Sequence, residues 1–511
     1  MKAERLFRII GLVDEDLIEE AEQPPLRRSV PWRRWATTAA CAAVILLGGF
    51  YFTVLSSFQG CGASAPAGGG NAAPAEGESG DSEASISGGS PMEGQEDGSS
   101  AFLSYAGPVL PLTLAADTPG LEAERTLTWD LTPSDGAARP WGAAVTDDYT
   151  LFNTTDRELT ASALYPFIGS FWDLSQTLPA LAVNGQTAET KLYAGEGQTR
   201  ADTWTDYAAL LEDRDYQDRA MASASELEQP VTLYAFTDLQ APENSGAAPT
   251  LAITLTSGQD TAVLSAGFNG FSWEMETGWS QYSVFLPDGQ SGREASSVYL
   301  LVLGEDLEGY TAQGYQDGSC SPGKELDTVK FSVSRRETTL SQALKQVLPT
   351  LLPTEMSDQW NSEGEMQSLF FQTLEKRLAR EGPLCRDIAR QLGGSLDELT
   401  SSLLSQSRIF YLAADVTVPA GGSTSVSASL RKEPSFDFYG AGPQENQGVQ
   451  GYDLLTQGSV LSFRAATAAM VNGERMKLVR QNFGFQPEKE TGALALDPAV
   501  PHYYLELRPL E

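Results

Sequence analysis

The longest apolar run in the chain is Ala36–Phe58, a stretch of 23 residues without a charged side chain. At about 1.5 Å per residue, a helix of this length crosses a hydrocarbon core of roughly 30 Å. Four arginines at positions 27, 28, 33 and 34 precede the run, and the next basic residue is Arg125. Because basic flanks stay in the cytoplasm, the pattern predicts a single-pass transmembrane helix at 36–58, with residues 1–35 inside and the remainder extracytoplasmic.

Short alternating segments separated by turn residues begin beyond residue 100. Such spacing is typical of antiparallel sandwiches. In residues 101–200 the predicted strands are Thr126–Leu131, Tyr149–Asn153, Glu158–Leu164 and Ala180–Val183, with a turn at Asn184-Gly185. Period 3.6 over Asp202–Ala224 then predicts a connecting helix within 201–229.

Strand patterns return after residue 230 and are interrupted by a helical block at about 338–408. Thr339 with Gln342 and Ser395 with Glu398 form capping boxes in this block. The predicted strands before it are Val231–Phe236, Thr250–Thr256, Thr261–Phe268, Ser272–Thr277, Gln281–Phe285, Val298–Leu303 and Val329–Val333. After it, 460–471 and 474–481 flank Asn472-Gly473 as a hairpin. The order strands, helices, strands predicts one β domain with a helical insertion.

The predicted fold class is therefore mainly β (α+β), with one N-terminal transmembrane helix followed by antiparallel β-sandwich-like extracytoplasmic domains. Residues 59–100 are rich in Gly, Ala, Ser and acid and predict a disordered linker. The expected division is 1–35 cytoplasmic segment with short helices, 36–58 transmembrane helix, 59–100 linker, 101–200 β-sandwich-like domain, 201–229 connecting helix and 230–511 second β domain.

Charge narrows the range of partners. Asp and Glu number 68 against 34 Lys and Arg, and residues 1–35 hold seven of each sign, so the net charge of −34 lies on the predicted outer side. Nucleic-acid binding depends on basic side chains that neutralise phosphates. We therefore expect no nucleic-acid partner.

Two questions about cysteine remain open in the sequence. The segment Phe58-Gln59-Gly60-Cys61 after an apolar run resembles a bacterial lipoprotein cleavage site, which would make Cys61 a lipidated N-terminus in place of a retained span. Cys320 and Cys385 both fall in the predicted exported part, where a disulfide persists if the two side chains meet.

Residues that carry catalysis are scarce. The sole histidine, His502, shares a predicted strand face with Tyr504, Glu506 and Arg508, and we expect that face to be exposed. Phosphate-binding loops, His-containing zinc motifs and Gly-x-Ser-x-Gly elbows are absent from the sequence. We accordingly expect no enzyme and assign no catalytic, cofactor-binding or metal residues and no cofactor.

Three weaker alternatives involve side chains in the β regions. Glu274 and Glu276 would lie roughly 6.5–7 Å apart on one strand face, a spacing open to glycoside hydrolysis. Two aromatic groups are open to ligand binding, and Asp147 and Asp148 with Asp156 are open to a cation. The aromatic groups are Phe271, Trp273, Trp279 and Tyr282, and Tyr439, Tyr452, Phe483 and Phe485.

The cytoplasmic segment carries a stripe of apolar residues, Leu6, Ile9, Ile10 and Val13, at helical spacing. The run from Leu6 to Ala21, with its basic Trp-containing flank and single span, resembles the start of clostridial-type single-pass membrane proteins related to anti-sigma-factor-like regulators. The resemblance covers about 60 residues and implies a cytoplasmic end that communicates with a transcription factor. The zinc-ligand His and Cys of many such factors are missing from residues 1–35.

The leading expectation is a non-enzymatic, membrane-anchored extracytoplasmic sensor or regulatory protein of a Gram-positive-type envelope. Its partners would be the membrane, a cytoplasmic protein docked on residues 1–23, and an envelope protein or glycan outside. The alternative is a cell-wall-associated binding module or lipoprotein. An exported carboxylate-dependent glycoside hydrolase is third.

Overall fold

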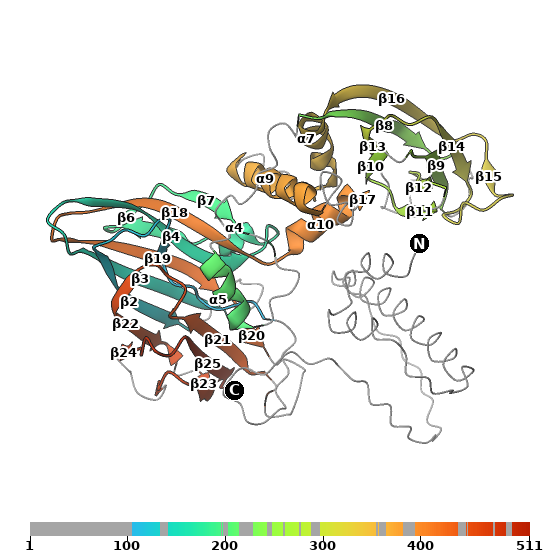
Figure 1. The fold of residues 1–511 in the computed structure, drawn as a ribbon. Coiled ribbons are helices and arrows are strands. Elements are labelled where there is room, and N and C mark those ends of the chain that lie inside the picture. Colours follow the sequence, from blue (N-terminus) through green and yellow to red (C-terminus); the bar gives the residue numbers. More distant parts are fainter. Residues whose placement is uncertain are drawn as a thin grey trace, which may run out of the picture. The chain divides into compact units, whose positions relative to one another are not determined.

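The structure is a computed structural model of a mainly β protein with several antiparallel and mixed sheets and a few helices (Figure 1). The chain divides after Ser87, and every described residue lies in the unit 88–511. The described residues are 105–132, 142–195, 197, 203–213, 228–242, 248–258, 261–274, 277–287, 297–353, 356, 364–381, 394–437, 446, 448–473, 476–486 and 493–510.

The predicted cytoplasmic segment 1–35, transmembrane helix 36–58 and linker 59–100 lie outside the described residues. Within the described part of the chain, none of the helices has both the length and the apolar character that crossing a bilayer requires.

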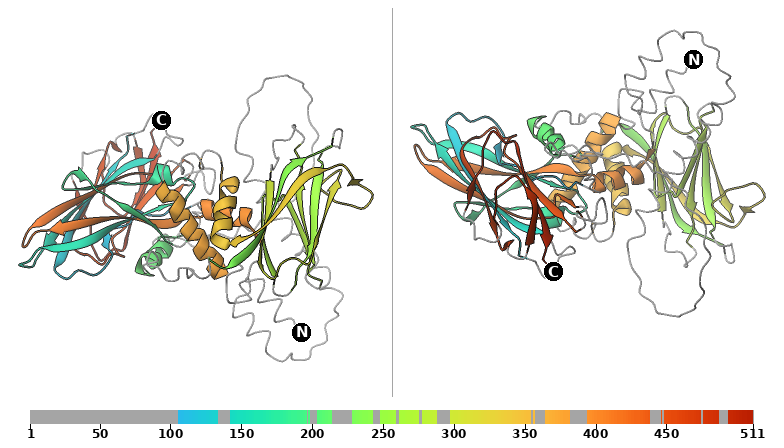
Figure 2. Two further views of the ribbon diagram at one scale, coloured as in Figure 1. Left: turned by 90° about the horizontal axis from the view of Figure 1, so that it is seen from above. Right: turned by 90° about the horizontal axis from the view of Figure 1, so that it is seen from below.

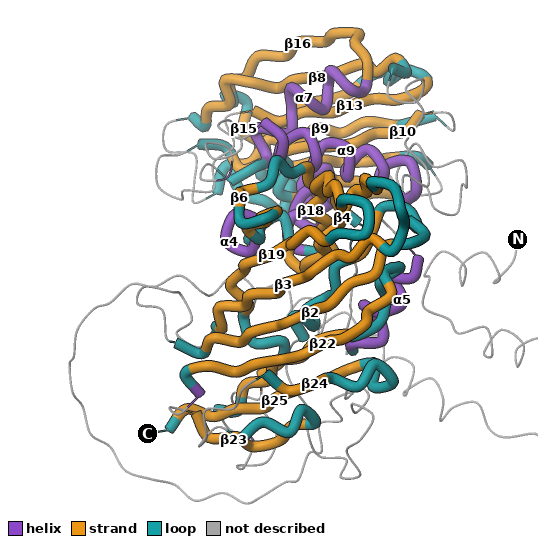
Figure 3. Tube along the Cα trace, turned by 90° about the vertical axis from the view of Figure 1, so that its left-hand side faces the viewer, coloured by secondary structure: helices purple, strands orange, loops and turns teal. Residues whose placement is uncertain are grey.

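The largest sheet joins strands from both ends of the described chain. Its strand order is β24-β22-β2-β3-β19-β5-β6, and Figure 3 shows β24, β22, β2, β3 and β19 side by side. All its pairings are antiparallel except that of β2 with β22. Its strands are β2 (Leu121–Asp130), β3 (Ala143–Asn153), β5 (Ala180–Val183), β6 (Gln186–Thr187), β19 (Ser423–Lys432), β22 (Ser462–Val471) and β24 (Leu494–Ala495).

Of two further four-stranded sheets, the first also joins distant segments, and the second comes from residues 436–509 alone. In the first, of order β1-β4-β18-β7, β4 and β18 pair antiparallel over eleven residues. The strands are β1 (Thr113–Leu114), β4 (Leu159–Gly169), β7 (Lys191–Ala194) and β18 (Arg408–Val418). The second, of order β20-β21-β25-β23, contains β20 (Phe436–Asp437), β21 (Gln450–Leu455), β23 (Met476–Gln481) and β25 (His502–Pro509).

The chain between β7 and β18 forms a separate pair of sheets, which we name the inserted sandwich (Figure 2). One sheet has the order β16-β8-β13-β10-β17 and the other β11-β12-β9-β14-β15. Its strands are β8 (Pro230–Gln240), β9 (Thr250–Thr256), β10 (Thr261–Ala266), β11 (Gly270–Glu274), β12 (Trp279–Phe285), β13 (Ser297–Gly304), β14 (Tyr310–Tyr315), β15 (Glu325–Leu326), β16 (Lys330–Thr339) and β17 (Gly394–Ser395).

The core of the inserted sandwich follows from the alternation in its strands. Phe236 and Leu300 from one sheet share an apolar cluster with Leu251, Ile253 and Val284 from the other. All five side chains are fully buried. Burial of alternate residues from both sheets is the main source of stability in such a two-layer fold.

The helical block consists of α7 (Leu340–Leu351), α9 (Gly364–Glu381) and α10 (Leu396–Ser405). Both predicted caps are confirmed. Thr339 Oγ1 accepts a hydrogen bond from the backbone N–H of Gln342 at 3.4 Å, and Ser395 Oγ accepts one from the backbone N–H of Glu398 at 3.3 Å. Among the described residues, α4 (Leu174–Thr177) and α5 (Trp204–Asp213) are further helices. The predicted connecting helix is thus described only over its first part.

The strand pairing differs from the expected division at residue 230. Strands of the segment 101–200 do not form a sandwich of their own, because β2 pairs with β22 and β4 pairs with β18. The blue and teal strands therefore lie among orange and red ones in Figure 1. We name the three sheets outside the inserted sandwich the β body. In the chain, the inserted sandwich and its helices interrupt the β body, whereas the sequence pattern had suggested that the helices alone were the insertion.

The predicted hairpin around Asn472-Gly473 is wrong. β22 pairs with β2 and β24, while β23 pairs with β25 in another sheet. Asn472 does adopt the left-handed conformation, with φ of 57°. The turn therefore passes the chain from one sheet to the next instead of closing a strand pair.

Candidate functional site on an exposed aromatic strand

Two large aromatic side chains are exposed on β11, the terminal strand of its sheet among the described strands. Phe271 is 54% exposed and Trp273 is 57% exposed. The strand register places Phe271 opposite Tyr282 and Trp273 opposite Ser280. The two side chains are neighbours on one face, and contiguous exposed apolar patches, unlike single exposed residues, mark interaction sites.

Phe271 and Trp273 lie on the same face of their sheet as the core residues of the sandwich, but at the edge of that face. Tyr282, which faces Phe271 on one side, faces the fully buried Ile253 on the other. The rings of Phe271 and Tyr282 are 4.9 Å apart between centroids, at an interplanar angle of 36°. Burial raises the pKa of Tyr282 to about 12. The buried Tyr282 therefore contacts the Phe271 ring, and about half of the Phe271 side chain stays exposed.

The predicted aromatic group is divided by the pleat of the sheet. Trp279 pairs with Glu274, so both lie on the face opposite to that of Phe271 and Trp273. The carboxylate of Glu274 accepts a hydrogen bond from Thr277 Oγ1 at 2.7 Å. Its suggested catalytic partner, Glu276, lies outside the described residues.

The other terminal strands of the inserted sandwich carry features that discourage pairing. β15 and β17 are each two residues long. β16 carries exposed Lys330, Arg335 and Arg336, and Arg335 forms a 2.6 Å ion pair with Asp306. Short strands and charged side chains are the usual means of preventing further strand addition. By contrast, β11 is five residues long and carries no basic residue.

The second predicted aromatic group belongs to the core. Tyr452, Phe483 and Phe485 are buried, and the Phe483 and Phe485 rings stack with centroids 5.0 Å apart. Tyr439 lies outside the described residues. The described members of this group therefore present no binding surface.

The expected exposed position of His502 is wrong. His502 is 7% exposed, and its Nε2 lies 2.8 Å from Oδ2 of the fully buried Asp453. The hydroxyl of Tyr105 donates to the same carboxylate oxygen at 2.5 Å. The indole of Trp204 stacks on the imidazole ring. These groups join β25, β21 and α5, which explains the histidine as part of the packing.

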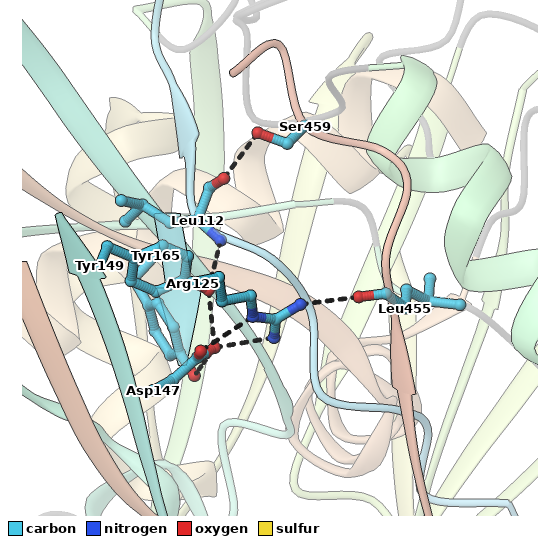
Figure 4. Close-up of polar contacts among 7 residues, drawn as sticks. All are labelled: Leu112, Arg125, Asp147, Tyr149, Tyr165, Leu455 and Ser459. Atoms are coloured by element: carbon cyan, nitrogen blue, oxygen red, sulfur yellow. Dashed lines mark hydrogen bonds and ion pairs between the residues drawn. The ribbon is translucent and has the colours of Figure 1, made fainter. Parts of the chain in front are cut away.

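The acidic group suggested for a cation is also separated. Asp147 is fully buried and accepts two 2.8 Å hydrogen bonds from Arg125, with a further one of 2.6 Å from the Tyr149 hydroxyl (Figure 4). Asp148, the next residue on the strand, instead accepts from Ser427 at 2.5 Å. In the part of the chain that is described, no set of three or more His, Cys, Asp or Glu side chains is placed to hold a metal ion.

A cavity of about 280 Å³ lies between α5 and the sheet of β1 and β18. Two of its hydroxyl groups are already engaged, because Ser459 donates to the carbonyl of Leu112 at 2.6 Å and Thr113 accepts from the amide of Val460 at 3.1 Å. The same Ser459 contact appears in Figure 4. The cavity is therefore a weaker candidate than the β11 surface.

The sequence indicated the aromatic residues of β11 but not the reason that they matter. Alternation predicted a strand at 272–277, and the observed strand begins two residues earlier. Whether a strand lies at the end of a sheet depends on its pairing partners, which local periodicity does not reveal. Cys320 is half-buried, and Cys385, its suggested disulfide partner, lies outside the described residues.

Comparisons with known proteins add no family. No protein-family model and no curated protein matches the chain. A solved structure with some similarity is the N-terminal domain of the Streptococcus gordonii adhesin Sgo0707, with 8% sequence identity and a TM-score of 0.10 over 80% of this chain and 88% of that chain. A similarity this weak carries no argument about fold or function.

Proposed function

We propose that this chain is a non-enzymatic, membrane-anchored extracytoplasmic sensor or regulatory protein of a Gram-positive-type envelope, and that it binds its external ligand at β11. The observation that carries this proposal is the exposure of Phe271 and Trp273, at 54% and 57%, on a terminal strand without a Lys or Arg. When a partner covers the two rings, apolar surface is removed from water, which stabilises the complex.

The anchoring part of the proposal rests on the apolar run 36–58 and its arginine flank. The cytoplasmic residues 1–23 would pass the signal to a protein inside the cell, as the resemblance to anti-sigma-factor-like regulators implies. The body beyond residue 58 would then be extracytoplasmic.

The alternative is a cell-wall-associated binding module, anchored by the span or by lipid on Cys61. Exposed Phe271 and Trp273 favour this function equally, because flat rings also stack on sugars. The two proposals differ in whether residues 1–23 have an output, and only the alternative allows a lipid anchor on Cys61.

Two measurements test the proposal. First, the full chain in lipid nanodiscs is mixed with isolated envelope material and pelleted. Binding should fall in the Phe271→Ala/Trp273→Ala double variant and persist in Trp172→Ala, which removes another indole that is 58% exposed. Equal binding by all three proteins would refute ligand reception at β11.

Second, deletion of residues 1–23 separates the sensor from the binding module. A sensor would lose its transcriptional response while its envelope binding persists. An unaltered transcript profile would favour the binding module.

A further inference from the structure

We infer that β11 receives an extended polypeptide segment, which adds to the sheet as a further strand and places alternate side chains over Phe271 and Trp273. This inference rests on the proposed function and specifies its ligand class. The partner is an envelope polypeptide with apolar residues at every second position and basic residues near the Glu274 end of β11.

The backbone of β11 provides the first part of the argument. Its five residues pair with β12 on one side, and no described strand pairs with the other side. A terminal antiparallel strand directs alternate N–H and C=O groups away from its partner. Over five residues, at about 3.4 Å each, this open edge is roughly 17 Å long and matches a segment of similar length.

The side chains of β11 provide the second part. Phe271 and Trp273 are two positions apart, so their side chains project to one face from backbone positions about 7 Å apart. Trp273 faces Ser280 across the strand pair, and this small side chain leaves much of the indole uncovered. An added strand would place its own side chains beside both rings, at the period that strand addition requires.

The contrast between the terminal strands of the sandwich provides the third part. β15 and β17 are short, and β16 carries Lys330, Arg335 and Arg336. A glycan that stacks on rings does not need a regular row of backbone N–H and C=O groups beside them. A peptide uses both features, and β11 is the described terminal strand of the sandwich that combines them.

The negative charge of the chain favours a basic partner segment over a second copy of this chain. The chain has a net charge of −34, and β11 itself carries Glu274 and no Lys or Arg. Two copies brought together would repel each other. A segment with Lys or Arg next to Glu274 would instead gain a favourable contact at the end of the strand.

The test uses the full chain in nanodiscs and a display library of random peptides of about nine residues, a length that exceeds the edge of β11. Peptides enriched on the wild-type protein should bind Trp273→Ala roughly tenfold more weakly and bind Trp172→Ala unchanged. Thermal unfolding of each variant shows whether it is folded.

A second comparison probes the backbone directly. Each enriched peptide is made in two N-methylated forms, one blocked at odd positions and one at even positions. Strand addition requires that one form loses binding by roughly tenfold or more while the other retains it, because alternate amides face β11.

Three outcomes would overturn the inference: no peptide that discriminates wild type from Trp273→Ala, equal binding of both N-methylated forms, or capture of soluble peptidoglycan fragments at the same residues without peptide binding. The last outcome leaves ligand reception at β11 intact and changes only the ligand class. If envelope binding is also insensitive to the Phe271→Ala/Trp273→Ala double variant, the proposed function is removed as well.

Discussion

The indole ring of Trp204 lies parallel to the imidazole ring of His502, with 5.0 Å between the ring centroids and an interplanar angle of 6°. Trp204 is the first residue of α5, so this contact joins the helix to β25. One turn later, the ring of Tyr207 lies 5.9 Å from that of Tyr105. Aromatic contacts thus hold α5 on the β body.

Replacement of Trp204 by Ala should loosen α5. The aromatic pair contributes about 0.5–1.5 kcal/mol beyond area burial, so amide hydrogen exchange within 204–213 should accelerate roughly tenfold. Trp172→Ala is the matched control, because Trp172 is 58% exposed and lies outside α5. Unchanged protection of α5 would contradict the role assigned to the stack.

The buried pair of Arg125 and Asp147 should be sensitive to removal of one partner. Asp147→Asn leaves the guanidinium without its counter-ion, and we expect a loss of about 3–5 kcal/mol in the free energy of unfolding, measured by urea denaturation. The double variant Arg125→Met/Asp147→Leu should lose less, because both charges are removed.

The surface pair of Lys324 and Asp317 serves as the comparison. Both side chains are more than 40% exposed, so Lys324→Ala should alter the free energy of unfolding far less than Asp147→Asn does. Equal losses for Asp147→Asn and Lys324→Ala would show that the buried pair has no special weight.

Lys432 should make stability depend on alkaline pH. Burial lowers the pKa of Lys432 from 10.5 to about 8. Between these values the unfolded chain binds one proton more than the folded chain, so this side chain should raise the free energy of unfolding with pH by up to about 1.4 kcal/mol per unit.

Lys432→Met tests this dependence, because it removes the titrating group. Its free energy of unfolding should exceed that of wild type most at pH about 7, and the difference should shrink as pH approaches 10.5. Denaturation of both proteins across this interval is the measurement. Parallel curves would exclude Lys432 as the source.

Gly451 tests the packing between β20 and β21. A Cβ atom at this position would overlap the buried ring of Phe436, its cross-strand partner. Gly451→Ala should therefore lower the free energy of unfolding by about 1–3 kcal/mol. At Gly309 a Cβ atom would meet nothing within 4 Å, so Gly309→Ala should change stability little. Similar melting curves for both variants would refute the contact.

Local signals in the sequence predicted local structure well. The turn Asn184-Gly185 is confirmed, with φ of 50° and 74° at its two residues, as a tight hairpin requires. The helix caps at Thr339 and Ser395 are confirmed for the same reason. In each case the residues that decide the conformation are neighbours in the chain.

Predictions that depended on distant partners failed. Asn472-Gly473 has the residues of a hairpin turn, yet β22 finds a better partner in β2, some 340 residues earlier. His502 looked exposed because polar residues alternate along its strand. Inside the core it forms a hydrogen bond with Asp453, which lies on another strand. The terminal place of β11 among the described strands of its sheet is likewise a property of sheet order.

Because β2 pairs with β22 and β4 pairs with β18, the early strands are synthesised well before their partners. At roughly 5–20 residues per second, the earlier strands wait about 10–70 s before their partners leave the ribosome. During this interval their edges stay open, and any export machinery or chaperone meets an incomplete fold. Truncation before β22 would therefore leave one edge of β2 permanently without its partner, although β2 would still pair with β3.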